Sequence, residues 1–239
     1  MAKGKLYLIP SPLGEYDPSE VIPPQVLERL KEIRKYVVEE ARTARRYLSA
    51  AGLKGHVAEL EFHELNEHTK PAEVEALLSM FSDPDGSPTD VGLVSEAGLP
   101  AVADPGARLV ALCHDHGIKV VPMVGPSSLM LALMGSGLNG QSFAFCGYLP
   151  AKADERRKAI REIERRSSQL NQTEIFIETP YRNDSMMADL LAALQPETRL
   201  CVAADITLPD ETILTKSVRH WRRTPFTIGK RPCVFLILA

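Results

Sequence analysis

The sequence lacks the cysteine spacing of a zinc site and carries few aromatic residues. Aromatic side chains make up 6% of the chain, with a single tryptophan at position 221. The four cysteines stand far apart and form no CxxC pair; they are Cys113, Cys146, Cys201 and Cys233. This usage argues against a zinc site built on cysteine and predicts a reduced, cytoplasmic protein. Trp221 stands among arginines, which leaves open a core position or a platform for stacking a nucleobase.

Long apolar runs are also missing. No run reaches the ~18 residues that a transmembrane helix needs, so the sequence predicts no membrane contact. The apolar stretch near the N-terminus begins after Lys5 and meets Pro10 at once, which predicts a strand rather than a signal peptide.

Positive charge is not in excess. The net charge is −3, which argues against a dedicated nucleic-acid coat but allows a local basic face. One cluster holds Arg42, Arg45 and Arg46, and a second, from 156 to 166, alternates with acids as on a solvated helix face. The third cluster, with Arg219, Arg222 and Arg223, lacks such compensation and is the better candidate for an anionic partner.

What the sequence does have is three loops that follow short apolar runs and contain glycine. They are Pro10-Ser11-Pro12-Leu13-Gly14, the stretch SEAGLPAVADPG at 95 to 106, and VGPSS at 124 to 128. In open α/β sheets, ligands bind at the carboxyl ends of strands, where glycine lets the backbone approach them closely. The pattern predicts a small molecule held largely by main-chain groups.

Strands alternate with helical patterns along the chain, which indicates an α/β fold with a parallel sheet. Strands are expected near 6 to 9, 36 to 39, 91 to 94 and 118 to 121, and again at 143 to 147, 174 to 178, 200 to 204 and 233 to 238. We expect an N-terminal α/β domain at 1–122, a connecting loop and apolar helix at 123–138, and a C-terminal mixed α/β domain at 139–239.

Five ordered motifs resemble the tetrapyrrole methylase superfamily. They are LYLIPSPLG, VSEAGLPAVADPG, VPMVGPSS, GYLPAK and FIETPYR. The branch they resemble is that of bacterial enzymes that methylate a cytidine 2′-hydroxyl of small-subunit ribosomal RNA. The resemblance implies S-adenosylmethionine (SAM) as methyl donor, S-adenosylhomocysteine as product, a cofactor cleft between two domains, and a homodimer.

The cofactor contacts that the resemblance implies fall on strand ends and loops. In order along the chain they are Pro10, Ala97, Gly98, Leu99, Val102, Ser127, Ser128, Glu178 and Thr207. Ala97 and Gly98 are small enough for close backbone approach, and the two serines open a helix whose N-terminus suits a carboxylate or hydroxyl. A turn glycine and a helix-capping serine would be the structural alternatives.

A ribose acceptor benefits from a general base, for which Glu40, Glu96 and His63 are the candidates. The segment FHELNEH at 62 to 68 does not have the spacing of a zincin, because position 67 is Glu67, and it predicts no metal site. It resembles instead a substrate-side loop with Asn66 and Glu67. The remaining predicted substrate contacts are Arg42, Arg219, Arg222 and Arg223.

The chain departs from the ribosomal RNA branch at three motifs. Glu96 replaces an aspartate, Glu40-Ala41-Arg42-Thr43 replaces Glu-Asp-Thr-Arg, and Asp205-Ile206-Thr207-Leu208 lacks a lysine. These changes leave three functions open: a methyltransferase for ribosomal RNA or a related acceptor, a methylase of a small molecule, and a non-catalytic SAM-binding protein associated with ribosomes.

Overall fold

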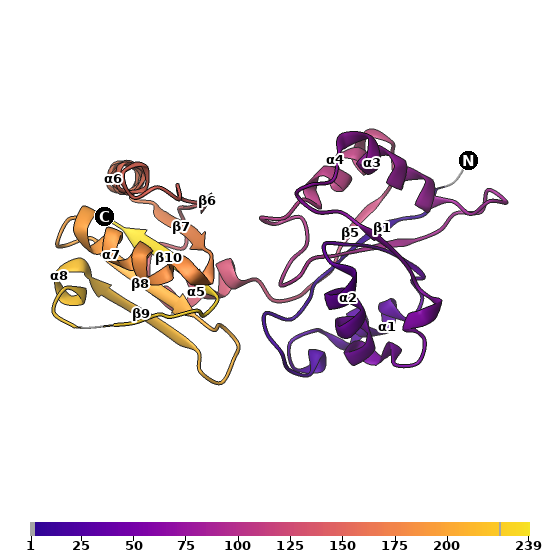
Figure 1. Cartoon of the computed structure of the whole chain (residues 1–239), viewed down its shortest axis with the longest axis horizontal. Coiled ribbons are helices and arrows are strands. Elements are labelled where there is room, and N and C mark those ends of the chain that lie inside the picture. Colours follow the sequence, from indigo (N-terminus) through magenta and orange to yellow (C-terminus); the bar gives the residue numbers. More distant parts are fainter. Residues whose placement is uncertain (1–2, 225) are drawn as a thin grey trace. The chain divides into compact units, whose positions relative to one another are not determined.

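The computed structural model describes residues 3–224 and 226–239. The chain divides into two compact units, the first ending at Ser127 and the second beginning at Ser128 (Figure 1). This division falls inside the segment 123–138 that the sequence marks as a connection, and the apolar helix of that segment belongs to the second unit. Each unit has its own five-stranded sheet.

The first unit is a parallel sheet with strand order β3-β2-β4-β1-β5. Its strands are β1 (Leu6–Ile9), β2 (Lys35–Val38), β3 (Glu61–Glu64), β4 (Val91–Val94) and β5 (Val120–Pro122). Its helices are α1 (Pro24–Leu30), α2 (Ala41–Leu48), α3 (Pro71–Ala76) and α4 (Ala107–Asp115). Shorter helical turns are η1 (Pro18–Glu20), η2 (Ser49–Leu53), η3 (Val57–Glu59) and η4 (Leu77–Phe81).

The helices of the first unit cover opposite faces of its sheet. One core joins α1 and α2 to the face that carries Tyr36 and Val38, and the other joins α3 and α4 to the face that carries Val37 and Leu93. Strand β4 lies between β2 and β1. The helices that follow β1 and β2 are α1 and α2, and they pack on the face opposite to that of α4, which follows β4. At the carboxyl end of β4 the chain therefore crosses to one face of the sheet, whereas after the neighbouring strands β1 and β2 it crosses to the other face. Open α/β sheets bind ligands at such a position.

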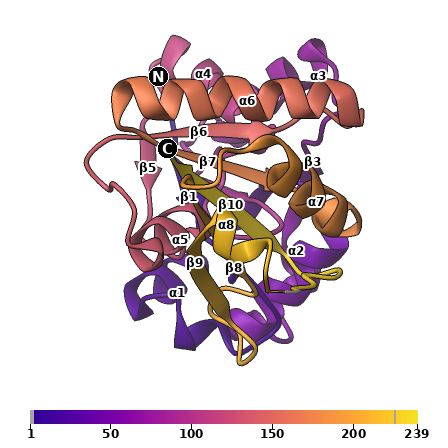
Figure 2. The ribbon, with the colours of Figure 1, turned by 90° about the vertical axis from the view of Figure 1, so that its left-hand side faces the viewer.

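The second unit has a mixed sheet of order β6-β7-β10-β8-β9. Its strands are β6 (Phe143–Tyr148), β7 (Thr173–Glu178), β8 (Arg199–Ala204), β9 (Thr212–Ser217) and β10 (Cys233–Leu238). Its helices are α5 (Ser128–Ser136), α6 (Ala153–Leu170), α7 (Asn183–Ala193) and α8 (Val218–Trp221), with a turn η5 (Pro180–Arg182). Helices α6 and α7 pack side by side over one face of this sheet (Figure 2).

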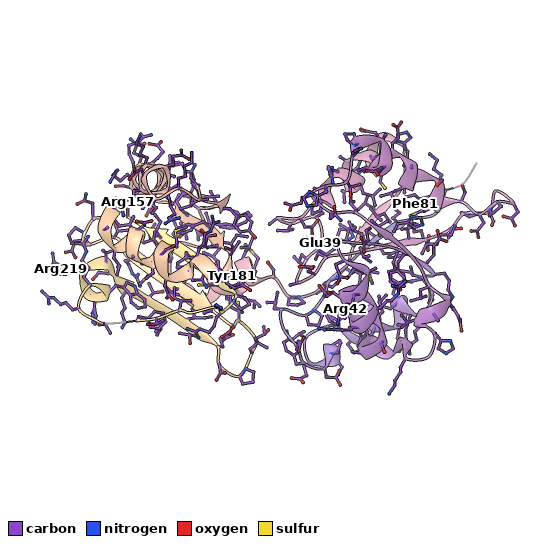
Figure 3. All side chains as sticks on the ribbon, viewed as in Figure 1. Glu39, Arg42, Phe81, Arg157, Tyr181 and Arg219 are labelled. Atoms are coloured by element: carbon purple, nitrogen blue, oxygen red, sulfur yellow. The ribbon has the colours of Figure 1, made fainter. Side chains whose placement is uncertain are left out.

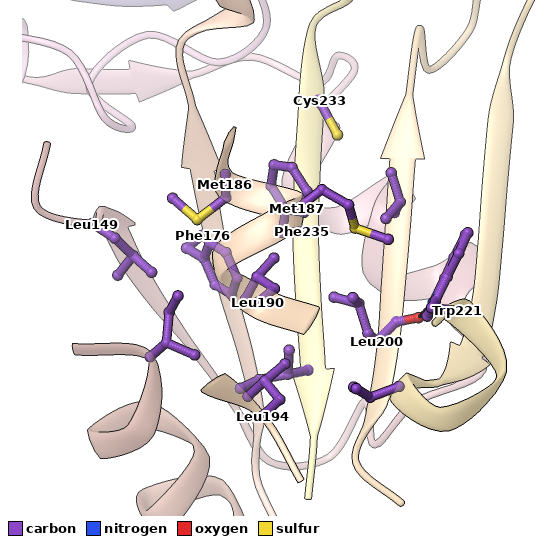
Figure 4. Packing of buried hydrophobic residues seen from close by; sticks show 14 of the residues in the cluster. Leu149, Phe176, Met186, Met187, Leu190, Leu194, Leu200, Trp221, Cys233 and Phe235 are labelled. Carbon is purple, nitrogen blue, oxygen red and sulfur yellow. Dashed lines mark hydrogen bonds between the residues drawn. The ribbon is translucent and has the colours of Figure 1, made fainter. Parts of the chain in front are cut away.

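Trp221 is a core residue of the second unit. Its side chain is buried against the α7 side of the sheet, and its indole Nε1 donates a hydrogen bond to the carbonyl of Leu200 at 2.9 Å (Figure 4). Phe176 and Phe235 stack at the centre of the same core, with ring centroids 5.6 Å apart. Of the two sequence-based interpretations of Trp221, the structure confirms the core position.

Two expectations from the sequence need correction. The segment that begins at Phe62 is not all loop, because Glu61–Glu64 forms the edge strand β3. The basic helix face from 156 to 166 is not simply solvated, because Arg156 is buried and bonds Asp189 of α7 through two nitrogens, 2.8 and 2.5 Å away. In both cases a partner distant in sequence decides the outcome, and short-range charge patterns do not reveal it.

Candidate active site

The first two glycine-bearing loops join across the carboxyl end of the first sheet. The amide of Ser11 donates to the carbonyl of Gly98 at 2.9 Å, and the amide of Gly98 donates back to the Ser11 carbonyl at 3.1 Å. The Ser11 hydroxyl also donates to the carbonyl of Ser95 at 3.1 Å. The loops that follow β1 and β4 are thus fixed to each other by three hydrogen bonds.

The third loop packs against the same place. A Cβ on Gly125 would lie 2.2 Å from the Cβ of Pro10, so only glycine allows this approach. Gly98 has a φ of +74°, and a Cβ there would lie 3.2 Å from Leu13 and 3.5 Å from the carbonyl oxygen of Pro126. All three loops therefore meet at one edge of the sheet, as their positions after strands predict.

The loop after β4 has a strained backbone at Ala101 and Ala103, whose φ angles are +66° and +61°. Asp104 stabilises this shape, since its carboxylate accepts the amides of Ala101 at 2.8 Å and Gly106 at 2.6 Å. Between the two alanines, Val102 leaves 45% of its surface exposed. Strain of this kind collects at functional sites, and an exposed apolar side chain there suits contact with a ligand.

A carboxylate that the sequence analysis passed over, Glu39, lies directly after β2 (Figure 3). Its side chain accepts the backbone amide of Glu96 at 3.3 Å. Burial raises the pKa of Glu39, and repulsion from the charges of Glu96, Asp104 and Glu67 raises it further, while the hydrogen bond from the amide of Glu96 lowers it. Its place immediately after β2, like that of Glu96 two residues after β4, was the signal that could have found it.

Glu40 caps helix α2. Its carboxylate accepts the amides of Arg42 at 2.8 Å and Thr43 at 2.7 Å, together with the hydroxyl of Thr43 at 2.5 Å. These bonds, with that from the Thr43 hydroxyl the strongest, lower the pKa of Glu40. A carboxylate held in its charged form by a helix N-terminus is a weak proton acceptor, so the geometry disfavours Glu40 as a general base.

His63 lies on β3 and its Nε2 is 2.6 Å from the carboxylate of Glu61. The alternation of the strand places Phe62 with Tyr36 on the α2 side of the sheet, and therefore His63 on the α3 side. In the loop that follows, the carbonyl of Asn66 accepts from Arg108 of α4 at 2.7 Å, and its side-chain oxygen accepts the amide of His68 at 3.0 Å. This loop is bound to α4, and Glu67 is exposed on it.

A pocket of about 450 Å³ opens beside these loops on the α2 side. Its lining includes Ser11 and Tyr16 from the first loop, Arg46 and Tyr47 from α2, and Glu96. The hydroxyl of Tyr47 donates to the carbonyl of Pro10 at 2.7 Å, which ties α2 to the loop after β1. The pocket therefore lies at the switch point of the sheet and has both an acidic and a basic side chain in its wall.

The remaining predicted cofactor residues belong to the second unit. Ser128 begins α5. Glu178 ends β7, and its Oε1 accepts from the amide of Thr179 at 2.7 Å and from Arg182 at 3.0 and 2.5 Å. Within residues 3–224 and 226–239, its buried Oε2 has no hydrogen-bond partner. Thr207 follows β8 with a φ of +73°, and its amide donates to Glu211 at 2.8 Å.

In the third basic cluster, which holds Arg219, Arg222 and Arg223, two of the three arginines have partners that the sequence does not reveal. Arg219 forms an ion pair with Glu197. Arg222 donates to the carbonyls of Leu191 and Leu194 at the end of α7, at 2.7 to 3.0 Å, so it closes that helix. The expectation of an uncompensated cluster is therefore wrong for Arg219 and Arg222. Arg223 is exposed. Arg42, in the first turn of α2, is exposed as well (Figure 3).

The model of the tetrapyrrole (corrin/porphyrin) methylase family matches residues 6–220. The chain belongs to this family. A ribosomal RNA small subunit methyltransferase I from Neisseria meningitidis is 36% identical over 90% of this chain and 68% of its own length. The enzyme of the same name from Pseudomonas aeruginosa is 30% identical over 99% of this chain and 79% of its own length. The relatives are thus longer than this chain.

Two solved structures share the fold at low sequence identity. The methyltransferase CobJ aligns with a TM-score of 0.63 and 17% identity, covering 98% of this chain and 94% of its own. Uroporphyrin-III C-methyltransferase from Thermus thermophilus, in complex with S-adenosylhomocysteine, aligns with a TM-score of 0.58 and 18% identity, covering 98% and 97%. These likenesses confirm the two-part α/β architecture that the motifs predict.

The chain is therefore a SAM-dependent methyltransferase. The loop geometry fits that cofactor, because Gly98 and Gly125 have no side chain to keep a ligand away from the backbone. The exposed side chain of Val102, in the same loop as Gly98, offers an apolar contact. No helix in the described ranges is long and apolar enough to cross a membrane. Within the same ranges, no cluster of three or more His, Cys, Asp and Glu side chains could hold a metal ion.

Proposed function

We propose that this methyltransferase modifies a ribose 2′-hydroxyl of small-subunit ribosomal RNA at the carboxyl edge of its first sheet. The relatives at 30 to 36% identity carry the name of ribosomal RNA small subunit methyltransferase I. The observation that carries the proposal is the pocket of about 450 Å³ beside the glycine loops, which has the size to take a nucleoside and has Glu96 in its wall.

The chain's part in the reaction is to bind, to orient and to accept a proton. SAM supplies a methyl group already activated on a sulfonium. We assign its binding to Pro10, Ala97, Gly98, Leu99, Val102 and Ser127 in the first unit and to Ser128, Glu178 and Thr207 in the second. The hydrogen bonds between Ser11 and Gly98 keep the first two loops rigid. Fixed orientation of donor and acceptor can contribute about 7 to 11 kcal/mol to such a transfer.

We assign Glu96 as the general base. It lines the pocket directly, whereas Glu40 is committed to the cap of α2 and His63 lies on the other face of the sheet. Glu39 is a positioning residue, because its carboxylate accepts the backbone amide of Glu96 and so fixes the loop that carries the base. In this arrangement Glu96 takes the proton of the ribose hydroxyl as the methyl group is transferred.

The acceptor's phosphates require cations at the surface. Arg42 and Arg223 are exposed, and Arg219 is held only by a surface ion pair, which is weak in water. We retain these three as phosphate contacts and Asn66 with Glu67 as a loop on the substrate side. Arg222 is assigned to the end of α7 instead. A ribosomal substrate would place the protein in the cytoplasm.

We further propose that the protein is a homodimer, with the α5 side of the second sheet as its interface. Leu129 and Leu133 of α5 are buried in the second unit, but Met134 is 77% exposed. Phe143 and Phe145 are also exposed, at the β6 edge of the same sheet face. Replacing Met134 with glutamate should shift the mass measured by light scattering from dimer to monomer. A monomeric parent protein at micromolar concentration would contradict the proposal.

The experiment that tests the function has two parts. Calorimetry should first show that the purified protein binds SAM. Labelled SAM should then transfer its methyl group to RNA in small ribosomal subunits that lack the modification. Binding of SAM without any RNA methylation would overturn the ribosomal acceptor, and would leave a small-molecule methylase or a non-catalytic SAM-binding protein.

A further inference from the structure

A second hollow, lined by cations, adjoins the pocket of the first unit. This groove, of about 630 Å³, lies along α2 and η2 and includes Arg45, Arg46 and Lys54 in its wall. It shares Arg46 and Ala50 with the pocket that Glu96 lines. The two hollows therefore meet at these two residues.

The opposite end of the pocket is acidic. A small recess of about 10 Å³, lined by Glu39, Glu40 and Glu96, shares Glu96 and Thr43 with the pocket. Along one face of the first unit the order is thus carboxylates, pocket, cations. An elongated ligand that fills this path would need a neutral proton donor at one end and negative charge at the other.

The cations of the groove can meet an anion. The guanidinium of Arg46 pairs with Glu15 at 2.7 Å, but Arg46 is 63% and Glu15 89% exposed, so the pair is weak and a phosphate can displace it. Arg45 lies over the ring of Phe62, 4.6 Å from its centroid, which fixes its side chain against the sheet. Lys54 is exposed immediately after η2.

We propose that single-stranded RNA lies along this α2–η2 face, with the acceptor nucleoside in the pocket and the phosphate next to it in the groove. Arg46 and Lys54 contact that phosphate, and Glu96 faces the ribose hydroxyl. The acidic end repels phosphate and the basic end attracts it, so the charges set the direction in which the strand enters. The inference rests on the proposed function and adds to it the path of the RNA on this surface.

The test measures binding of a fluorescent single-stranded oligoribonucleotide over a range of salt concentrations. The double variant Arg46→Glu/Lys54→Glu should lose affinity by roughly tenfold or more. Its salt dependence should fall by about 0.7 units of slope, because the variant loses its contact with one phosphate and each phosphate neutralised on a single strand contributes about 0.7. SAM affinity, measured by calorimetry, should stay at the parent value.

A matched control carries the same change of charge at the amino ends of two strands of the same sheet. Lys5 and Lys119 precede β1 and β5, and both are exposed. The variant Lys5→Glu/Lys119→Glu should bind RNA nearly as the parent does. An equal loss of RNA affinity in the two double variants, or no loss in either, would contradict the proposal that RNA binds in the groove.

A third variant tests the junction without changing charge. Ala50→Trp puts a large side chain in the wall that pocket and groove share, and should so reduce RNA affinity while SAM still binds. If the parent methylates RNA and all groove variants bind RNA as tightly as the parent, RNA does not bind in the groove and the proposed function is unaffected. If RNA is not methylated but its binding depends on Arg46 and Lys54, RNA binds in the groove and the proposed function is wrong. A parent that does not bind RNA contradicts the groove outright.

Discussion

Two basic regions, the layer of α6 and α7 in the second unit and the stretch of α2 and η2 in the first, use their cations in opposite ways. In the second unit, Arg156 is buried against Asp189, Arg222 closes α7 and Arg166 pairs with the fully buried Glu174. In the first unit, Arg46 and Lys54 stand in the wall of an open groove. Stretches of similar basic composition therefore stabilise the fold in the second unit and are available to bind an anion in the first. The difference lies in the partners that the fold brings to each cation.

The largest effect should come from breaking a structural cation. Arg156→Ala leaves part of the buried charge of Asp189 unpaired, so we expect a loss of about 3 kcal/mol in the free energy of unfolding. Arg165→Ala on the same helix removes an exposed pair with Glu162 and should cost less than about 0.5 kcal/mol. Urea unfolding of the two variants measures the difference. Similar losses would show that burial does not separate the two arginines.

The next effect concerns the chemical step in the first unit. Glu96→Gln keeps the shape of the side chain but removes the proton acceptor, so the rate of methyl transfer should fall about a hundredfold or more. The affinity for SAM should not change. A variant with the parent's turnover rate would remove Glu96 from the mechanism.

A smaller effect is expected where backbone meets the cofactor. Gly98→Val adds a side chain at a positive φ and close to Leu13 and Pro126, and should weaken SAM binding by about tenfold or more. Gly117, also at positive φ but with open space around it, offers the control Gly117→Val. Calorimetry on the folded variants separates strain, which both share, from loss of the site, which only Gly98→Val should show.

The smallest effect is on the pH dependence of stability. Because the pKa of Glu39 is raised in the folded protein, the folded state holds this proton more tightly than the unfolded state does. The stability that this group contributes is present below the unfolded pKa and is lost as the pH rises through the folded pKa. Glu39→Gln should therefore raise the melting temperature at pH 7 relative to the parent, and raise it less at pH 4. A gain that is the same at both pH values would contradict the raised pKa.

The sequence predicted the parts of the site that depend on local pattern. Glycine loops after apolar runs located the meeting of Ser11, Gly98 and Gly125, because strand ends and turn residues are local signals. It did not predict β3, because the charged residues Glu61 and Glu64 at its two ends disguise this edge strand. Short apolar runs were sufficient for the central strands, which are buried on both faces.

Long-range contacts explain what the sequence did not reveal. The choice between the adjacent carboxylates Glu39 and Glu40 depends on which one caps α2. The sequence pointed to Glu40 and not to Glu39, because no local pattern shows which of the two the helix binds. The role of Arg222 depends on the carbonyls of Leu191 and Leu194, about thirty residues away along the chain. Partners at such separation are set by packing rather than by the local pattern that sequence reasoning uses.

The central claim is that the acceptor is an RNA ribose hydroxyl and that Glu96 activates it. The most direct measurement is mass spectrometry of nucleosides from small-subunit RNA treated with SAM and either the parent protein or Glu96→Gln. We expect a 2′-O-methylated nucleoside with the parent protein and a much smaller amount with the variant. A methyl group on a base, or equal methylation by the two proteins, would contradict it.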